Sequence, residues 1–413
     1  MFWLVRLKGF EKLVRVDEAL RIFLKESSLK ALGKERLPLT KCYGRVLASD
    51  VKAEVDVPPF DRSAMDGYAI RSSDSIGASP FTPKALKLVE NAPIGVFEAK
   101  RVWTGGPIPE GADAVIELEY TRERNGEIEI LNQVAPWRNV SRRGEDIKRG
   151  EVALEAGVRL RPQHIGLAAA LGMVELEVVR EPKVAIISTG SELVSLGEKP
   201  KEGEIVDSNK LILSGMCLEL GAEPIDYGIA RDTIDEIAAK IHSASQEADL
   251  ILTTGGTSVG KYDLVPSAIE TLDGGEILVH GIALRPGMPT ALGKVKMKPI
   301  IALSGNPVAA MVGFEIFARQ ALLSMMGAKY ESRPAVKGRL TRNVASTLGF
   351  KVFLRVKVTY HSGEFYVEPI RAKGSSIITS MCRANGYVLI PEDREGLKSG
   401  EEVTVYLFNT VGG

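Results

Sequence analysis

The chain has 413 residues, of which 45% are hydrophobic and 26% charged, and its formal net charge is zero. This length predicts roughly three domains, the composition is that of a folded soluble protein, and the zero net charge argues against a general nucleic-acid binder. Three widely spaced cysteines and four scattered histidines indicate neither a disulfide framework nor a zinc site. No apolar run approaches the ~20 residues of a membrane span, and the opening segment is too short for a signal peptide. A reduced, cytoplasmic setting is therefore expected.

Residues Val16 to Lys30 predict an amphipathic helix, because their apolar side chains recur on one helical face. The segment Pro58 to Ile70, PPFDRSAMDGYAI, then crowds polar side chains around a turn. Its paired prolines exclude a central strand or a helix interior. Taken alone, the segment is best interpreted as a surface turn with Asx-type hydrogen bonds.

Residues Ala85 to Gln133 predict several short strands separated by glycine and proline turns. Two of these strands are joined by TGGPIPEGADAVI, Thr104 to Ile116. Glu117 and Glu119 are expected to project from one strand face, because they alternate with Leu118. Residues 51–137 are thus predicted to form a small β-rich domain.

The loop RRGEDIKRG, Arg142 to Gly150, has two interpretations. It is either a solvated charge cluster or a loop that offers cations to a phosphate and a carboxylate to a metal. A helix is predicted from Arg161-Pro162 to Gly172. This helix is expected to pack against the helix at Val16, which would make the β-rich domain an insertion between them.

Residues from Glu181 to about Ala328 alternate predicted strands and helices. The runs KVAIIST, LILTT and PIIALS are continuously apolar, as buried parallel strands are. Small polar or glycine-rich loops follow them, namely STG, TTGG and LSGN. Helices are predicted after the caps Asp207-Ser208-Asn209, Thr233 and Asn306, and Pro266 and Pro307 are expected at first helical positions.

The stretch from Asp249 to Val265, DLILTTGGTSVGKYDLV, carries the clearest binding signal. Its glycines allow positive φ and close backbone approach, and backbone N–H groups there could hold an anion. The carboxylate of Asp263 suits a hydrated Mg²⁺ beside a phosphate. A tight turn with a solvated aspartate explains the stretch equally well. Three such loops would gather at one sheet edge. A binding site for a phosphate-bearing ligand is therefore favoured over the alternative, an α/β domain in which these loops are only tight turns.

From Pro334 onward, short alternating segments with turns at Ser362-Gly363 and Asn385-Gly386 predict a small antiparallel barrel or sandwich. Within it, RAKGSSIITSMCRANG is expected to be solvent-exposed. The alternative is a loop that reaches a ligand with side chains of the following residues: Arg371, Lys373, Ser375 and Ser376.

Taken together and in this order, the motifs resemble the molybdopterin molybdenumtransferase family of the MoeA type, related to the E domain of gephyrin. The motifs are PPFDRSAMDGYAI, TGGPIPEGADAV, RRGEDI, ISTGSEL, GEIVDSNKLIL, TTGGTSVGKYD, RPGMPTALGK and LSGNPVAA. The resemblance covers nearly the whole chain. The motifs before Arg142 separate it from molybdopterin adenylyltransferases and CinA-like proteins, which share only the TTGG domain.

The resemblance implies an enzyme that inserts molybdate or tungstate into adenylylated molybdopterin, with Mg²⁺-dependent release of AMP. It implies a multidomain fold with an N-terminal mixed or helical domain (residues 1–50 and 138–180), the inserted β-rich domain (51–137), a central open α/β molybdopterin-binding domain (181–330) and a C-terminal small β-barrel (331–413). It also implies a homodimer with the active site between subunits, and transient contacts with the adenylyltransferase and with cofactor-accepting enzymes. Neither a nucleic acid nor a membrane is an expected partner.

The resemblance also implies site residues by matched motif. The catalytic candidates are Asp61, Thr104, Asp146, Glu192, Asp232 and Asp263, and the last three are the candidate Mg²⁺ ligands. The candidate substrate-binding residues are Ser188, Thr189, Gly190, Thr254, Gly255, Gly256, Ser258, Gly260, Arg285, Ser304, Gly305, Asn306 and Pro307. The oxyanion would be held by Arg62, Arg285 or the loop after Pro58.

The chain departs from the family pattern near Arg285. Several relatives carry a lysine where Met288 stands, and some carry a basic residue where Gly281 stands, next to His280. Which cation holds the substrate is therefore open, as is the choice between molybdate and tungstate. Two alternatives also stay open, a molybdopterin adenylyltransferase and a non-catalytic molybdopterin-binding scaffold on the same fold.

Overall fold

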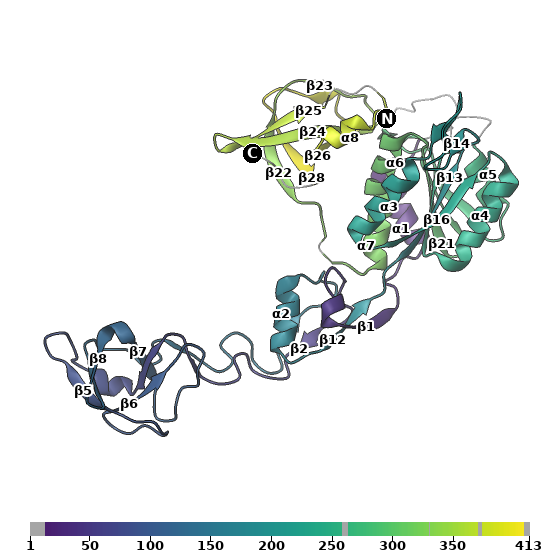
Figure 1. Ribbon diagram of the computed structural model, residues 1–413. Helices are drawn as coiled ribbons and strands as arrows, with labels where there is room; N and C mark the ends of the chain where they lie inside the picture. Colours follow the sequence, from purple (N-terminus) through teal and green to yellow (C-terminus); the bar gives the residue numbers. More distant parts are fainter. Residues whose placement is uncertain (1–12, 258–262, 330, 371–373, 409–413) are drawn as a thin grey trace. The chain divides into compact units, whose positions relative to one another are not determined.

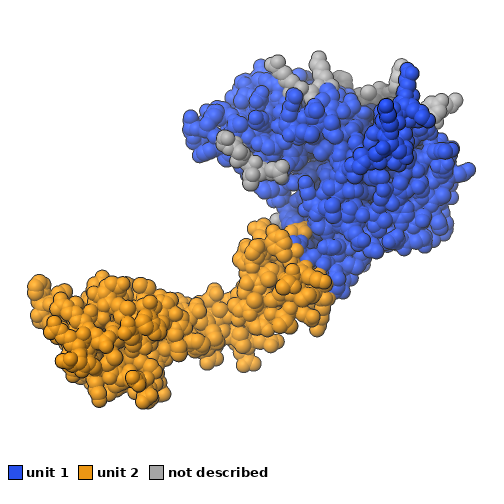
Figure 2. All heavy atoms as spheres, in the orientation of Figure 1, with its two compact units in different colours: residues 1–35, 44–46, 179–413 blue, residues 36–43, 47–178 orange. Residues whose placement is uncertain are grey.

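The computed structural model of the chain describes residues 13–257, 263–329, 331–370 and 374–408. It divides into two compact units (Figure 2). Unit 1 contains residues 1–35, 44–46 and 179–413, and unit 2 contains residues 36–43 and 47–178. The finer division into four domains stays a prediction.

A six-stranded sheet with the order β16-β13-β17-β21-β20-β18 forms the centre of unit 1. Its first four strands are parallel, and β20 and β18 are antiparallel to their neighbours. The parallel strands form because their apolar runs are covered on both faces, and every residue of β17 is buried. The bounds are β13 (Lys183–Thr189), β16 (Glu223–Ala230), β17 (Leu250–Thr254), β18 (Gly275–His280), β20 (Ala291–Val295) and β21 (Lys298–Leu303).

Helices cover both faces of this sheet (Figure 1). One face carries α4 (Ile234–Glu247) and α5 (Leu264–Glu270), which pack together. The other carries α3 (Asn209–Leu220) and a continuous helical run of α6 (Pro307–Gly313), the π-helical η4 (Phe314–Ala318) and α7 (Arg319–Met325). The open α/β sheet predicted from the sequence is therefore confirmed.

Several predicted helix ends are confirmed, and one is wrong. The hydroxyl of Thr233 accepts a hydrogen bond from the backbone N–H of Glu236, and Gly221 ends α3 with a left-handed φ of 80°. Helix α5 starts at Leu264, two residues before the predicted start at Pro266, and Asp263 is its N-cap residue.

The expectation that no apolar run reaches the length of a membrane span is wrong. The helical run Pro307–Met325 has 19 residues and a mean hydropathy of 1.4, so by length and composition alone it could cross a membrane. However, 78% of an 18-residue stretch of this helix is buried inside the protein, which is typical of a core helix. Its only charged side chains, Glu315 and Arg319, are buried and form an ion pair.

The C-terminal part of unit 1 is a closed barrel of five strands. Strands β24, β25, β22, β28 and β26 pair in this order, and β26 pairs back to β24. Of the two predicted alternatives, barrel and sandwich, the barrel is confirmed, and its closure leaves no exposed strand edge among these five strands. The prediction that it is antiparallel is wrong for one pairing, because β22 and β25 are parallel. The bounds are β22 (Ala335–Leu340), β24 (Lys351–His361), β25 (Glu364–Pro369), β26 (Gly386–Ile390) and β28 (Glu402–Leu407), with the short helix α8 (Thr379–Arg383) between β25 and β26.

The segment predicted to be exposed in this region is exposed at Ser376 and half-buried at Ser375. The carbonyl of Ser375 accepts a hydrogen bond from the backbone N–H of Val308, at the start of α6. Arg371 and Lys373 lie outside the described residues.

Unit 2 contains a second six-stranded sheet, with the order β7-β4-β6-β5-β9-β8. Its core includes Tyr68, Ile70, Leu86, Ile116 and Ile128. The bounds are β4 (Gly67–Ile70), β5 (Lys84–Leu88), β6 (Glu98–Val102), β7 (Ala114–Glu117), β8 (Thr121–Arg124) and β9 (Glu127–Ile130). The predicted β-rich character of this region is confirmed.

A separate core in unit 2 is formed around α2. Its buried side chains include Leu47, Leu154, Leu160, Ala168 and Val178. The remaining elements of this region are β1 (Lys34–Pro38), β2 (Val51–Lys52), β3 (Arg62–Ser63), β10 (Val140–Ser141), β11 (Val152–Leu154), α2 (Pro162–Ala170) and β12 (Glu175–Val179).

Two expectations about local packing are wrong. Helix α1 (Val16–Glu26) belongs to unit 1, where it packs against β18 and β20, whereas α2 belongs to unit 2, so the two helices are not partners. The apolar face of α1 does not specify which apolar surface covers it. Strand β7 ends at Glu117, and Glu119 lies in a 3₁₀ turn instead of on the same strand face.

The carboxylate of Asp249 forms hydrogen bonds at the amino-terminal edge of the unit 1 sheet. It accepts hydrogen bonds from Arg180 Nη1 at 2.8 Å and from the Lys183 backbone N–H at 2.9 Å. Burial raises the pKa of Asp249, but the hydrogen bonds from Arg180 and Lys183 and the charges of Arg180 and Lys298 outweigh burial, so that the pKa is lowered. The folded state therefore favours the ionised carboxylate.

Asp249→Asn is expected to lower the free energy of unfolding at neutral pH, by an amount that shrinks under acid conditions. The stabilisation is present above the unfolded pKa of about 4 and is lost as the pH falls through the lower folded pKa. Urea unfolding of both proteins at pH values from about 7 to about 3 measures this. A difference that stays constant over that range would contradict it.

Candidate functional site

A pocket of about 570 Å³ lies at the carboxyl edge of the parallel strands of unit 1. The loops after β13, β17 and β21 reach it together, because these strands are adjacent and in register, with Ser188 opposite Thr254 and Thr254 opposite Leu303. The loop after β16 contributes Asp232, and the start of α3 contributes Asp207, Ser208 and Asn209. The predicted convergence of loops at one edge is therefore what the structure shows.

Most of the residues predicted for the α/β part of the site line this pocket. They are Thr189, Gly190, Glu192, Asp232, Thr254, Gly255, Gly256, Ser304, Gly305, Asn306 and Pro307. Ser188 is fully buried within β13 and does not line it. Ser258 and Gly260 lie outside the described residues. The chemical roles of all these residues stay predictions.

The glycine loop after β17 packs closely against the end of β13. Gly255 has a φ of 92°, and a Cβ at this position would lie 2.2 Å from the carbonyl oxygen of Thr189. Gly256 has a φ of 61°, and its Cβ would lie 2.7 Å from Thr189 Oγ1. Both glycines are therefore required by backbone conformation and by space.

Gly255→Ala is expected to destabilise unit 1 by more than the ~1–3 kcal/mol of a strained backbone alone, because the new methyl group also forces β13 and the loop apart. Gly197→Ala is the matched control, since Gly197 has a φ of 93° but nothing within 4 Å of its Cβ position. Urea unfolding of both variants isolates the effect of the close contact. Equal losses of stability would show that the contact has no effect.

The carboxylates of Glu192 and Asp232 lie at the exposed rim of the pocket. Asp232 Oδ2 accepts a hydrogen bond from the backbone N–H of Ser191 at 2.9 Å, and the Asp232 N–H donates to Ser191 Oγ at 3.3 Å. This reciprocal pair holds the loops after β13 and β16 together. The carboxylates are thus presented to the pocket by two neighbouring strands.

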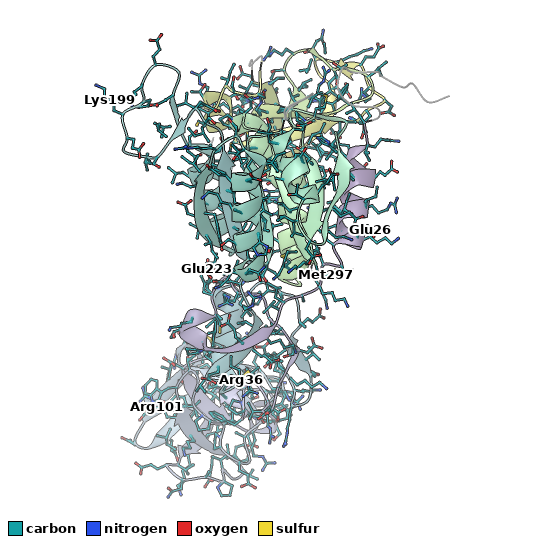
Figure 3. All side chains as sticks on the ribbon, turned by 90° about the vertical axis from the view of Figure 1, so that its right-hand side faces the viewer. Glu26, Arg36, Arg101, Lys199, Glu223 and Met297 are labelled. Carbon is teal, nitrogen blue, oxygen red and sulfur yellow. The ribbon has the colours of Figure 1, made fainter. Side chains whose placement is uncertain are left out.

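One wall of the pocket comes from the segment between β13 and α3. Its short strands β14 (Leu193–Val194) and β15 (Ile205–Val206) pair in parallel. Leu193, Ile205 and Val206 line the pocket, and the connection between the two strands, which carries Lys199, projects outward (Figure 3). This wall adds the apolar surface of these three side chains to the pocket.

The pocket is electronegative in the part of the chain that the structure describes. Its lining contains the carboxylates of Glu192, Asp207 and Asp232 and no lysine or arginine. A phosphate would be repelled by these charges unless a cation came with it. Carboxylate oxygens are ligands that Mg²⁺ accepts, commonly one or two of them together with substrate phosphates. The donor set therefore fits a magnesium ion shared with the substrate, although among the described residues no group of three or more possible ligands is arranged as a preformed metal site.

Asp263, the third candidate Mg²⁺ ligand, does not line the pocket. It occupies the N-cap position of α5, beside Leu264, which does line it. Asp263 Oδ2 lies 3.4 Å from His280 Nε2. The structure therefore places Asp263 beside His280, next to the pocket lining but not part of it.

Arg285 also lies away from the pocket lining. It forms the short strand β19 (Leu284–Arg285) beside β24 of the barrel. Its Nη1 donates to Thr347 Oγ1 at 3.0 Å, and its guanidinium carbon lies 4.1 Å from the centroid of the Phe350 ring. The barrel thus orients the guanidinium of Arg285, whose predicted role as a substrate-binding cation stays a prediction.

The remaining candidates, Asp61, Thr104 and Asp146, belong to unit 2. The backbone N–H of Arg143 donates to Asp61 Oδ1 at 2.6 Å, which joins PPFDRSAMDGYAI to RRGEDI. The backbone N–H and hydroxyl of Thr104 both donate to Asp66 Oδ1 at 2.8 Å. These two bonds, the backbone one first, lower the pKa of Asp66.

Asp207 and Asn209 are pocket residues that the sequence analysis assigned only to helix capping. Asp207 Oδ1 accepts a hydrogen bond from the Lys210 backbone N–H at 3.3 Å. Asn209 Nδ2 donates to Thr254 Oγ1 at 2.8 Å and to the carbonyl of Gly305 at 2.7 Å. Asn209 therefore ties α3 to the end of β17 and to the loop after β21, which no local sequence pattern could indicate.

Family models match three regions of the chain. The model described as MoeA N-terminal region (domain I and II) matches residues 14–172. The model described as "Probable molybdopterin binding domain" matches residues 185–324, and the MoeA C-terminal region (domain IV) matches residues 337–408. The three matches follow one another in the order of the MoeA regions.

Named relatives and a solved structure agree with these matches. Molybdopterin molybdenumtransferase 2 of Mycobacterium tuberculosis is 37% identical over 385 residues, covering 90% of this chain and 94% of that protein. Molybdopterin molybdenumtransferase of Bacillus subtilis is 33% identical over 415 residues, covering 97% and 95%. The crystal structure of a molybdopterin biosynthesis moeA protein from Pyrococcus horikoshii matches with a TM-score of 0.84 and 37% identity, over 96% of this chain and 100% of that one.

Proposed function

The chain belongs to the MoeA family, and from this premise we propose that it is a molybdopterin molybdenumtransferase acting in molybdenum cofactor biosynthesis. It inserts molybdate or tungstate into adenylylated molybdopterin and releases AMP. The observation that carries the proposal is the pocket at the sheet edge, where close-packed glycine loops meet the carboxylates of Glu192 and Asp232. Named relatives over nearly the whole chain support it.

Within this pocket, each loop has a task. The loops at Gly255 and Gly305 bring backbone close to the ligand, and they place the substrate pyrophosphate against N–H groups. Glu192 and Asp232 would hold Mg²⁺ beside that pyrophosphate, with Asp263 as the third proposed ligand. An ion held there would stabilise the negative charge that develops when the phosphoanhydride bond breaks.

We further propose that the protein works as a cytoplasmic homodimer. Asp61, Thr104 and Asp146 of one subunit would complete the site of the other. The oxyanion would be held by Arg285 or by Arg62, since a tetrahedral dianion requires cationic or N–H donors. Transient contacts with the adenylyltransferase and with cofactor-accepting enzymes belong to the same proposal.

The test is AMP release from adenylylated molybdopterin, followed with and without Mg²⁺, molybdate, tungstate and ATP. Release that requires Mg²⁺ and an oxyanion, and needs no ATP, is the expected result, and the more effective oxyanion identifies the metal. Consumption of ATP with unmodified molybdopterin would instead identify an adenylyltransferase. Tight binding of the substrate without AMP release would identify a scaffold.

A further inference from the structure

Two buried side-chain oxygen atoms of residues that line the pocket have no hydrogen-bond partner in the described part of the chain. They are Asp207 Oδ2 and Asn209 Oδ1. Asp207 is only 2% exposed and Asn209 only 8%, and both residues line the pocket. A shielded acceptor without a donor costs free energy, so the chain alone does not account for these two atoms.

The other polar atoms of both side chains are already engaged. Asp207 Oδ1 caps α3 through the Lys210 N–H, which leaves Oδ2 with no role in the cap. The orientation of the Asn209 amide follows from its neighbours, because the carbonyl of Gly305 can only accept a hydrogen bond. The nitrogen must therefore face Gly305 and Thr254, and Oδ1 must be the atom left over.

The surroundings indicate which ligand would satisfy this pair of acceptors. Both atoms are acceptors, so the ligand must present donors. Apolar side chains of Leu193, Val206 and Leu264 line the same pocket, which suits the face of a flat ring more than a hydrated ion. A planar heterocycle with neighbouring N–H donors on one edge combines both properties.

We propose that Asp207 and Asn209 form an acceptor pair that selects the substrate by the amino-pyrimidinone edge of its pterin. Asp207 Oδ2 accepts from the ring N–H and the exocyclic amino group, and Asn209 Oδ1 accepts a second hydrogen bond from the same edge. This inference rests on the proposed function, which supplies a pterin substrate. It assigns substrate selection to two residues that the capping pattern alone would explain as structural.

The test compares two ligands that differ in one group of this edge. Pterin-6-carboxylate carries an amino donor, and lumazine-6-carboxylate carries an oxygen acceptor at the same position. Equilibrium binding of each to the full chain is measured by calorimetry. The wild type is expected to prefer the pterin by about 10- to 100-fold, the worth of one or two hydrogen bonds to a charged group.

Asp207→Asn is expected to abolish or invert this preference, because an amide can turn its NH₂ group toward the lumazine oxygen. Asp226→Asn is the matched control, since Asp226 pairs with Lys210 of the same helix but does not line the pocket. It should bind both ligands as the wild type does. If Asp207→Asn does not fold, Asp207→Ser retains a cap oxygen and should weaken only pterin binding, about 10-fold.

Three results would overturn the inference. The first is that the wild type binds neither ligand or binds both equally. The second is that Asp207→Asn lowers the melting temperature but keeps the preference for the pterin. Asp207 would then have only a helix-capping role. The third is that Asp207→Asn weakens Mg²⁺ binding with the preference intact, which would make Asp207 a metal ligand. Failure of the proposed function is separate, because wild-type AMP release tests it without either analogue.

Discussion

Asp232→Asn is expected to lower the rate of AMP release from adenylylated molybdopterin by about 100-fold or more, the usual effect of removing a preorganised charge from a reaction site. Asp232 lies at the pocket rim and is held there by its reciprocal hydrogen bonds with Ser191. Asparagine can keep the bond from the Ser191 N–H while it removes the negative charge. The substitution therefore tests the charge with little change in loop geometry.

The measurement is the initial rate of AMP release as a function of Mg²⁺ concentration. For Asp232→Asn we expect both a lower maximal rate and a higher Mg²⁺ concentration at half-saturation. Asp235→Asn is the control, because Asp235 is an exposed residue in the first turn of α4 and does not line the pocket. Rates for Asp232→Asn within about twofold of this control would remove Asp232 from the site.

Glu315→Ala is expected to destabilise unit 1 by about 3–5 kcal/mol, the cost of leaving buried cations without their counter-charge. Glu315 is 4% exposed and lies in the π-helical segment of the long core helix. Its two carboxylate oxygens accept from Arg333 Nε at 2.9 Å and Nη2 at 2.8 Å, and Arg319 Nε lies 3.8 Å away. In the variant, the buried guanidinium of Arg319 and the half-buried guanidinium of Arg333 would both lose this carboxylate.

The same carboxylate joins the core helix to the barrel. The hydroxyl of Tyr387, in β26, donates to Glu315 Oε1 at 3.2 Å. Burial, followed by the negative charge of Glu315, raises the pKa of Tyr387 well above its ordinary value, so the phenol stays a neutral donor. The hydrogen bond with Glu315 raises the pKa of Arg333. Glu315 thus connects the core helix, the segment that leaves it and the barrel.

Urea unfolding followed by far-UV circular dichroism measures the loss of stability. Glu364→Ala is the matched control, because the exposed pair of Glu364 and Arg339 has N–O distances of 3.3 and 3.4 Å and should contribute at most about 1 kcal/mol. If Glu315→Ala cost no more than this control, the buried cluster would not stabilise the barrel against the core helix.

Local sequence pattern was sufficient to predict the fold class and most of the residues that line the pocket. The continuous apolar runs of β13, β17 and β21 predict parallel buried strands, because only strands covered on both faces exclude polar residues. Parallel strands bring their following loops to one edge, so the polar residues from Thr189, Gly255 and Ser304 onward could be grouped before any contact was known. Turn and cap residues such as Gly221 and Thr233 act within a few residues of the chain and were predicted for the same reason.

Contacts between distant segments were decided only by the tertiary structure. The Asn209 amide meets Gly305 across 96 residues, and this contact turned a predicted helix cap into part of the pocket. Arg285 was a predicted substrate cation, yet it lies against Thr347 and Phe350 of the barrel. The partner of α1 likewise depends on which apolar surface is left uncovered, which a hydrophobic period does not encode. The sequence by itself therefore determined which elements form and which loops share an edge, because those follow from local conformation and periodicity, whereas packing among remote residues decided which side chains meet.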